Sequence, residues 1–412
     1  MKNLYYGWVL VIMAACILGM QALMFYGRGV FLIPVTTEFG WDRGTLSGAF
    51  SIFLLVSGPL AILTGRLNDK YGPRVLLTVT GLLLGAGCLL MSQVSSLWQV
   101  YLIWALFMGV GTSCCIIPIM STIPRWFTRR RGTAIGITSA GFGLGGVIWP
   151  LVAQELISAY SWRHAFFILG LIVFAIIIPL AQFMKHSPQR IGLKPYGESE
   201  TVEYAQSPTS ATGGLSFTQA VKTSRFWLFG LIIFCLFFCL HVIMVHIAPH
   251  AVDLGISPML AASIISILAG TSVIGRLSTG FISDRAGARL ILSVCLSLLT
   301  LALVWLLFVG EIWTFYLFAV ITGFAIGGYM PLEILIVAEL FGLKSLGMIY
   351  GTIMIFSALG MTLGPIIAGT IFDMTGNYNW AFLICIILGA LAIFLSLLLL
   401  RYKGKKDLAI SG

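Results

Sequence analysis

Arg276 is the residue whose chemistry fits its surroundings least. It lies in the stretch Thr271–Gly280, inside a long apolar run, and no aspartate or glutamate lies within one helical turn of it. An ionisable residue buried at such a place is by default a candidate for function, because burying its charge is costly. Its planar guanidinium can hold both oxygens of a carboxylate, which predicts an anion-binding residue. The alternative is an arginine whose long side chain reaches the cytoplasmic surface.

Two histidines lie four residues apart near the end of another apolar run. His246 and His250 share one face of the predicted helix, and Pro249 between them predicts a bend. Because histidine titrates near neutral pH, both are candidates for proton coupling, and His250 also for substrate binding. The alternative places them in water at the outer end of the helix. A metal site is not predicted, since only Asp253 follows at usable spacing.

Three further polar residues interrupt apolar runs. Tyr329, within a glycine-rich stretch, can offer its hydroxyl to a bound carboxylate. Glu333 is predicted nearer the cytoplasmic end, where pairing with a loop arginine is favoured over proton coupling. Arg28 is predicted in the outer half of the first span, where it either attracts anions or anchors the helix at the interface.

The composition sets the class of protein. The chain has 412 residues, of which 59% are hydrophobic and only 9% charged. Soluble proteins carry about 25% charged residues, so a soluble enzyme is excluded. The eight cysteines all lie within apolar runs without C-x-x-C spacing, which argues against disulfides and zinc. No phosphate-binding loop is present, and we expect no cofactor, no metal and no nucleic-acid partner.

The elements that must position these residues are membrane-spanning helices. A span needs about 20 mainly apolar residues, and continuous apolarity favours helices over a β-barrel. We predict an all-α membrane protein with twelve transmembrane helices in two pseudo-symmetric six-helix bundles. The apolar runs are 7–33, 45–65, 75–95, 98–122, 133–156, 164–184, 226–250, 258–280, 289–309, 313–337, 347–371 and 380–401.

The basic residues gather in alternate loops. By the positive-inside rule, this bias predicts a multi-pass protein of the cell inner (plasma) membrane with both termini cytoplasmic. A polar segment divides the chain, which predicts an N-terminal bundle over 1–184, a cytoplasmic linker over 185–225, and a C-terminal bundle with a short tail over 226–412.

The two halves repeat at an offset of 215 residues. Gly65–Arg74 after the second run recurs as Gly280–Arg289 after the eighth. The same offset relates Gly132 to Gly347 and Pro150 to Pro365. Two parallel six-helix halves predict a secondary transporter with its site between repeats. A duplicated structural bundle is the alternative.

These motifs resemble a known family. The twice-repeated pattern G-x-x-x-D-x-x-G-x-R resembles the signature of the major facilitator superfamily. The stretch Trp126–Gly141 is similar to the fifth-helix motif of the monocarboxylate transporters and of the bacterial oxalate:formate antiporter branch. Tyr6–Trp8 and Phe39–Arg43 are also similar to these families. The resemblance implies the superfamily fold and a carboxylate substrate.

The resemblance also bears on site residues. Both branches carry an eighth-helix arginine at the place of Arg276, and animal monocarboxylate transporters have a lysine at a place similar to Arg28. Their aspartate one turn before the arginine is Ser272 here, so their proton site does not carry over. We predict that charges at the cytoplasmic helix ends gate access. The predicted gating residues are Asp69, Lys70, Arg74, Arg129, Arg130, Asp284, Arg285 and Arg289.

One central cation suits one carboxylate better than two, and the run 347–371 contains no lysine, arginine or histidine. The leading hypothesis is therefore a proton-coupled symporter of lactate- or pyruvate-like monocarboxylates that works by alternating access as a monomer in contact with membrane lipid. The alternative is a carboxylate exchanger of the oxalate:formate type. A multidrug exporter and a non-transporting sensor are less favoured.

Overall fold

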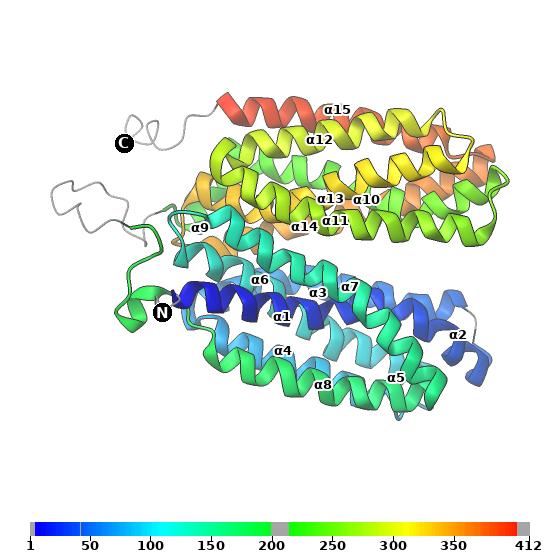
Figure 1. Cartoon of the computed structure of the whole chain (residues 1–412), viewed down its shortest axis with the longest axis horizontal. Coiled ribbons are helices and arrows are strands. Elements are labelled where there is room, and N and C mark those ends of the chain that lie inside the picture. The colour runs from blue at the N-terminus through cyan, green and yellow to red at the C-terminus, as the bar shows by residue number, and fades with distance from the viewer. Residues whose placement is uncertain (1–4, 42, 199–213, 402–412) are drawn as a thin grey trace. The chain divides into compact units, whose positions relative to one another are not determined.

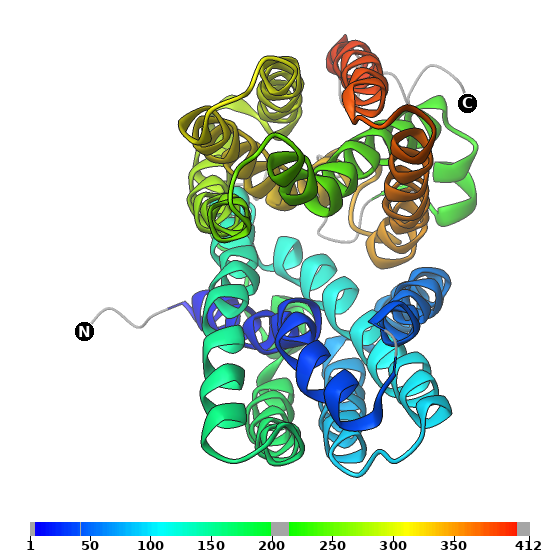
Figure 2. The same cartoon turned by 90° about the vertical axis from the view of Figure 1, so that its right-hand side faces the viewer.

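The computed structural model describes residues 5–41, 43–198 and 214–401, and it is helical throughout apart from isolated bridges. Its compact parts are two units, and we describe each by itself. The first contains residues 1–213 together with 343–352, and the second contains residues 214–342 and 353–412. In Figure 2, which looks along the helix axes, the helices of each unit form a bundle. The all-helical fold class is confirmed.

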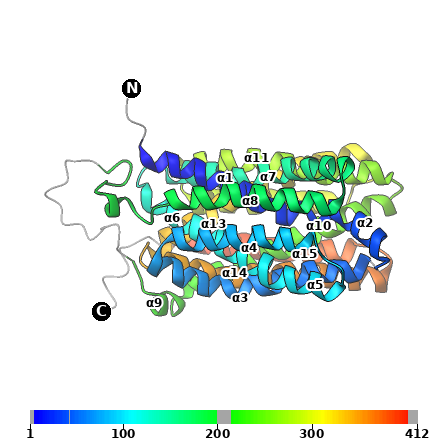
Figure 3. The same ribbon diagram turned by 90° about the horizontal axis from the view of Figure 1, so that it is seen from below.

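The first unit is built from long helices joined by short turns (Figure 1). They are α1 (Tyr6–Tyr26), α2 (Arg28–Phe39), α3 (Arg43–Tyr71), α4 (Pro73–Met91), α5 (Leu97–Leu102), the π-helical η1 (Ile103–Gly109), α6 (Val110–Trp126), α7 (Arg131–Ala159), α8 (Trp162–Phe183) and the short η2 (Pro188–Ile191). Helix α1 packs along α7, α3 along α6, and α4 along α8. Figure 3 shows α4 and α8 side by side.

The second unit repeats this plan. Its helices are α9 (Phe217–Val221), α10 (Ser224–Asp253), α11 (Pro258–Ala286), α12 (Ala288–Leu306), α13 (Ile312–Phe341), α14 (Leu346–Thr375) and α15 (Asn379–Arg401). Helix α11 packs along α13, and α15 packs against both α10 and α12. The first residues of α14 belong to the first unit by their contacts.

Within the described part, eleven helices are long and apolar enough to cross a membrane. Helix α3 adds a further helix of 29 residues, which at 1.5 Å per residue is about 43 Å long. A chain with these helices is a multi-span membrane protein.

The helix ends correct several predicted boundaries. The predicted run 7–33 is interrupted, because α1 ends at Tyr26 and α2 begins at Arg28 after Gly27. The motifs Gly65–Arg74 and Gly280–Arg289, which we placed in loops, lie mostly within the last turns of α3 and α11 and the first turns of α4 and α12. Apolarity marks the part of a helix inside hydrocarbon, while the helix itself continues into the polar interface.

The turns between these helices are single glycines. Gly72 joins α3 to α4 and Gly287 joins α11 to α12, and both have φ of 85°. Such a positive φ strains any residue with a side chain, whereas glycine adopts it freely. The two glycines are related by the repeat offset, as are both ends of α3 with α11 and of α4 with α12. The predicted repeat is therefore present in the backbone.

The segment that follows α8 is docked on the first unit. The Tyr5 hydroxyl donates to the carbonyl of Lys194 at 2.9 Å, and the amide of Tyr196 donates to the carbonyl of Trp126 at 2.8 Å. Burial raises the pKa of Tyr5 to about 12. Much of the predicted linker beyond residue 198 lies outside the described residues. In the first unit, we call the end that carries Arg74 and Arg130 the basic end. In the second unit, the basic end is the one that carries Arg285 and Arg289.

Candidate functional site

Close contact between α11 and α13 places the central arginine. A Cβ built on Gly327 would collide with the carbonyl oxygen of Ser272, and one on Gly323 would collide with Leu268 and Thr271. Small residues let membrane helices approach this closely, so Gly323 and Gly327 hold α13 against α11.

Arg276 lies on α11 inside the second unit. The residue is 3% exposed, and its Nη2 lies 3.1 Å from the sulfur of Met330 on α13. Helix α11 continues to Ala286, ten residues further, which places Arg276 about 15 Å from that end along the axis. It is therefore deeper than the predicted run 258–280 implied, because the helix does not end at Gly280.

Tyr329 stands beside Met330, next to an aromatic pair on α10. It is 3% exposed, and its ring meets the edge of Phe237 at 5.3 Å between centroids. The ring of His241 stacks on Phe237, and its Nδ1 lies 3.2 Å from the Phe237 carbonyl oxygen. We did not single out His241 from the sequence. The sequence signal that could have identified His241 was its place in the middle of an apolar span; in the structure it is half-exposed.

Glu333 lies one turn beyond Tyr329 and is 4% exposed. Helix α13 runs on to Phe341, so Glu333 is about 12 Å inside the helix end rather than close to it. The predicted span 313–337 ended too early, for the reason given for α11. Arg276, Tyr329 and Glu333 thus lie on the two most closely packed helices of the second unit.

The predicted histidine pair forms a separate group in the same unit. His246 lies with Nδ1 3.2 Å from the Tyr378 hydroxyl and Nε2 3.1 Å from the Pro365 carbonyl oxygen, which links α10 to α14 and to the start of α15. His250 packs edge-on against Phe315 and Phe382. Both histidines are buried, so neither stands in open water at a helix end.

The structure does not join every predicted site residue into one group. His246 lies about 8 Å along α10 beyond His241, away from Tyr329. Arg28 begins α2 next to the bend at Gly27, but its side chain lies outside the described residues. No three metal-binding side chains gather within the described residues.

Among the predicted gating residues, Asp69 has the clearest contacts between helices. Its Oδ1 accepts from Nη2 of Arg125 at 2.9 Å and from the amide of Gly347 at 3.2 Å, and its Oδ2 accepts from the amide of Met348 at 3.1 Å. The carboxylate therefore joins the end of α6 to the first turn of α14. A negative charge at a helix N-terminus also favours the helix dipole.

Lys70 and Arg74, which we grouped with Asp69 as predicted gating residues, have other contacts. Lys70 lies over the Tyr71 ring at 5.0 Å, and Nε of Arg74 donates to Gln182 at 2.8 Å. Lys70 is rotated about 100° from Asp69 on the helix, since α-helices have 3.6 residues per turn, and Arg74 lies beyond the turn. The actual partner, Arg125, is 56 residues away in sequence.

The other predicted gating residues have different contacts. Nε of Arg289 lies 3.3 Å from Glu339, and Arg285 lies over the Phe281 ring at 4.8 Å. Asp284 takes the place of Asp69 in the last turn of α11. Arg129 and Arg130 are exposed at the turn before α7, where Arg130 has φ of 60°.

Two further ionisable residues of the first unit, Arg163 and His186, have contacts that the sequence did not predict. Arg163 lies at the end opposite the basic end. It pairs with Glu38 at 2.7 Å and donates to the carbonyls of Ser92 and Val94, so it joins three elements there. His186 lies behind the Gly72 turn. Burial, together with nearby guanidinium groups, lowers the pKa of His186 to about 4.

Comparisons with known proteins agree with this architecture. The family model described as Major Facilitator Superfamily matches residues 14–310 and 251–411. Human Monocarboxylate transporter 12 is 28% identical, over 95% of this chain and 80% of the relative. An MFS-type transporter of Gibberella moniliformis is 30% identical, over 81% of this chain and 76% of the relative. The Escherichia coli fucose:proton symporter FucP has a TM-score of 0.71 at 14% identity, over 95% of this chain and 98% of that one. At this identity, FucP shares the fold alone.

Proposed function

We propose that this chain, which belongs to the Major Facilitator Superfamily of membrane transporters, carries small monocarboxylates of the lactate or pyruvate kind. The observation that carries the proposal is Arg276, a buried guanidinium on α11, about 15 Å from the helix end. A cation held at such depth compensates a carboxylate that must leave water to cross the membrane. Tyr329, on the adjoining face of α13, supplies a hydroxyl to the same anion.

Several features favour a single carboxylate. Residues 347–371 of α14 contain no lysine, arginine or histidine that could hold a second one. The surroundings of Tyr329 are apolar, with Phe237 against its ring, which suits a short aliphatic chain. Among the relatives, human Monocarboxylate transporter 12 has a name that gives monocarboxylates as what it transports. These points support a monocarboxylate over oxalate or a cationic drug.

We further propose that protons are coupled to transport through His246 and His250. Ser272 leaves no carboxylate one turn before Arg276, so the coupling group must lie elsewhere. His246 contacts Tyr378 and the Pro365 carbonyl, which gives its two nitrogens different partners and makes its protonation able to alter the α10–α14 contact. His241, stacked on Phe237, is a third candidate.

We place the basic ends of both units in the cytoplasm of a cell that carries the protein in its inner membrane. Transport then proceeds by alternating access of the halves 1–184 and 226–412 around the linker 185–225, and Asp69 with Arg125 stabilises one of the two states. A cysteine at the exposed position Gln189, in a background without native cysteines, should resist an impermeant thiol reagent in intact cells. Rapid labelling from outside would reverse this orientation.

The central test is uptake of radiolabelled short carboxylates into proteoliposomes, with and without acid outside. Arg276→Lys keeps the charge but loses the two-pronged geometry, so affinity should fall roughly ten- to a hundredfold, since a charge-assisted hydrogen bond is worth about 1.5–3 kcal/mol. Arg276→Gln should nearly abolish uptake. Lys222→Gln, at the exposed basic end, serves as the matched control.

The outcomes separate the parts of the proposal. Wild-type affinity in Arg276→Gln would show that this residue does not bind the anion. A rate of uptake that does not change with a pH gradient would contradict proton coupling and favour exchange of one carboxylate for another. The proposed carboxylate site at Arg276 would not be affected by that result.

A further inference from the structure

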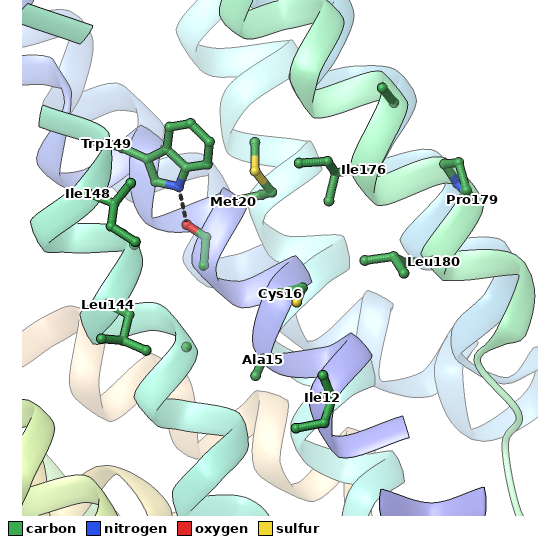
Figure 4. A pocket seen from close by; sticks show the side chains of 14 residues that line it. Ile12, Ala15, Cys16, Met20, Leu144, Ile148, Trp149, Ile176, Pro179 and Leu180 are labelled. Atoms are coloured by element: carbon green, nitrogen blue, oxygen red, sulfur yellow. Dashed lines mark hydrogen bonds between the residues drawn. The ribbon is translucent and has the colours of Figure 1, made fainter. Parts of the chain in front are cut away.

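An apolar groove runs along the outside of the first unit between α1, α7 and α8. Its volume is about 570 Å³, and its walls include Ile12 and Cys16 of α1, Leu144 and Ile148 of α7, and Ile176 of α8. Figure 4 shows these side chains around the groove, with the ring of Trp149 closing one side. Cys16, Leu144 and Ile148 are all exposed, so the groove is open to whatever surrounds the helices.

Helix packing makes the groove a fixed feature. A Cβ on Gly141 would collide with Ala15, and one on Gly145 would collide with Gly19, so the backbones of α1 and α7 touch. The Trp149 indole donates to the Gly19 carbonyl at 2.7 Å and fastens the same pair of helices (Figure 4). In Figure 1, α1 lies between α7 and α8, which meet at their shared turn away from the basic end. The groove therefore has a rigid floor.

Helical spacing shows where the groove leads. One turn before Ile12 on the same face of α1 is Trp8, and one turn after the lining residues of α8 is Phe183, which is exposed. The Tyr6 hydroxyl donates to the Phe183 carbonyl at 2.7 Å, so these two helix ends are in contact. The faces of α1 and α8 that line the groove thus continue to the basic end and to Trp8, and tryptophan is enriched at the membrane interface.

Three basic residues lie on the chain segments next to this end of the groove. The Trp8 ring packs on Phe127 at 4.9 Å, and Nε of Arg131 donates to the Phe127 carbonyl at 2.9 Å. On the other side, the Trp126 indole donates to the Lys185 carbonyl at 3.1 Å. Arg130 is exposed at the N-cap of α7.

An acidic residue near this end is Glu198, whose charge acts on Tyr5, while Asp69 at the basic end is paired with Arg125. Even with the Glu198 carboxylate counted, Arg130, Arg131 and Lys185 give the groove mouth a positive charge.

We propose that the groove holds an acyl chain of an anionic phospholipid from the leaflet at the basic end, with its phosphate on Arg130, Arg131 and Lys185. An apolar channel that ends at a cluster of cations matches a molecule with a hydrocarbon chain and an anionic head. From Ile12 to Met20, the groove extends about 12 Å along α1.

The test is lipid retention by the purified full-length transporter. The protein is reconstituted with phosphatidylglycerol carrying a photoreactive acyl chain, and cross-linked peptides are mapped; native mass spectrometry counts bound lipid. Cross-links should concentrate on α1, α7 and α8. Cys16→Trp fills the groove and should lower retention at least fivefold, whereas Cys16→Ser leaves it open and should not.

The head group is tested separately. Combined Arg130→Gln and Lys185→Gln should abolish the preference for phosphatidylglycerol over phosphatidylcholine. Leu82→Trp on the exposed face of α4 and Lys222→Gln on the second unit are controls matched in size and charge. Equal retention by Cys16→Trp and Cys16→Ser, cross-links spread evenly over the exposed helices, or a co-purifying protein that blocks cross-linking would each overturn the proposal.

Discussion

The contact of Asp69 with Arg125 gives a prediction whose size follows from the structure. The change is Asp69→Asn, which keeps the shape of the side chain and removes its charge. In the protein, the carboxylate accepts from Arg125 and from two amides of α14. The side chains of Arg125 and Asp69 are 9% and 15% exposed, so solvent screens the pair little.

Removing one partner of a buried ion pair leaves the other charge uncompensated, which costs about 3–5 kcal/mol. The remaining amide oxygen of asparagine still accepts from α14, and the lost interaction with the helix dipole adds about 0.3–1 kcal/mol. We expect Asp69→Asn to lower the free energy of unfolding by about 3–6 kcal/mol. Asp69→Asn combined with Arg125→Met should lose less than the two single changes added together, with a coupling of about 1–3 kcal/mol.

The assay is unfolding of the purified transporter in detergent, run on wild type, both single variants and the double variant. Asp373→Asn, on an exposed carboxylate, is the control and should change stability by less than about 0.5 kcal/mol. Transport is measured in parallel, and turnover should fall more than substrate affinity because Asp69 is not among the residues proposed to bind the anion. Strict additivity of the two substitutions would refute the reasoning, as would a loss of affinity at unchanged turnover.

Three further predictions concern stability. In the folded protein the pKa of His186 is about 4, below its ordinary 6.5, so the unfolded chain binds a proton more readily. Acidification from pH 6.5 toward 4 should therefore destabilise the protein. His186→Asn should recover about 1–2 kcal/mol of the free energy of unfolding at pH 5, which melting curves at pH 5 and pH 6.5 would measure. Arg163→Lys cannot reach Glu38 and two carbonyls together and should cost about 1–2 kcal/mol after allowance for exposure, measured by thermal unfolding, whereas an unchanged melting temperature would deny its bridging role. Gly327→Ala should cost about 1–3 kcal/mol by overpacking, while Gly270→Ala, with open space around it, should be neutral, and equal melting temperatures would contradict the close contact of α11 with α13.

The superfamily was predicted from short motifs and is confirmed, and the predicted resemblance to monocarboxylate transporters agrees with the relatives that the chain is similar to. The repeat was also visible, because identical glycines at matched positions mark turns that only a residue without a side chain adopts easily. Gly72 and Gly287 illustrate this, since both have φ of 85°. Sequence spacing is informative where a local backbone conformation restricts the residue type.

Helix ends and charge partners were predicted less well. The hydropathy of α3 falls after Gly65, yet the helix continues to Tyr71 because polar residues in the interface form helix as readily as apolar ones. The partner of Asp69 could not be read from the sequence, since Arg125 meets it only through the packing of α3 on α6. His241 was missed because one histidine in an apolar run gives no spacing signal.

The two halves of the repeat have different residue types at equivalent positions, which indicates different roles for the two halves. At the repeat offset, Arg125 corresponds to Leu340 and Arg163 to Tyr378. At these two places the first half has arginines that form ion pairs, whereas the second half has an apolar and an aromatic residue, although the acidic partners Asp69 and Glu38 correspond to Asp284 and Asp253. Ion pairs of this kind fix one arrangement of helices and offer no free charge to a substrate.

The buried ionisable side chains follow the same division. Among the described residues, Arg125 is the buried arginine of the first unit and is paired, while Arg276, Glu333, His246 and His250 all lie in the second. An ionisable residue inside a membrane bundle is costly and is retained for a function. The proposed anion and proton sites therefore lie in the second half of the duplicated fold, while Arg125 of the first half, paired with Asp69, has the proposed role of stabilising one state of the transporter.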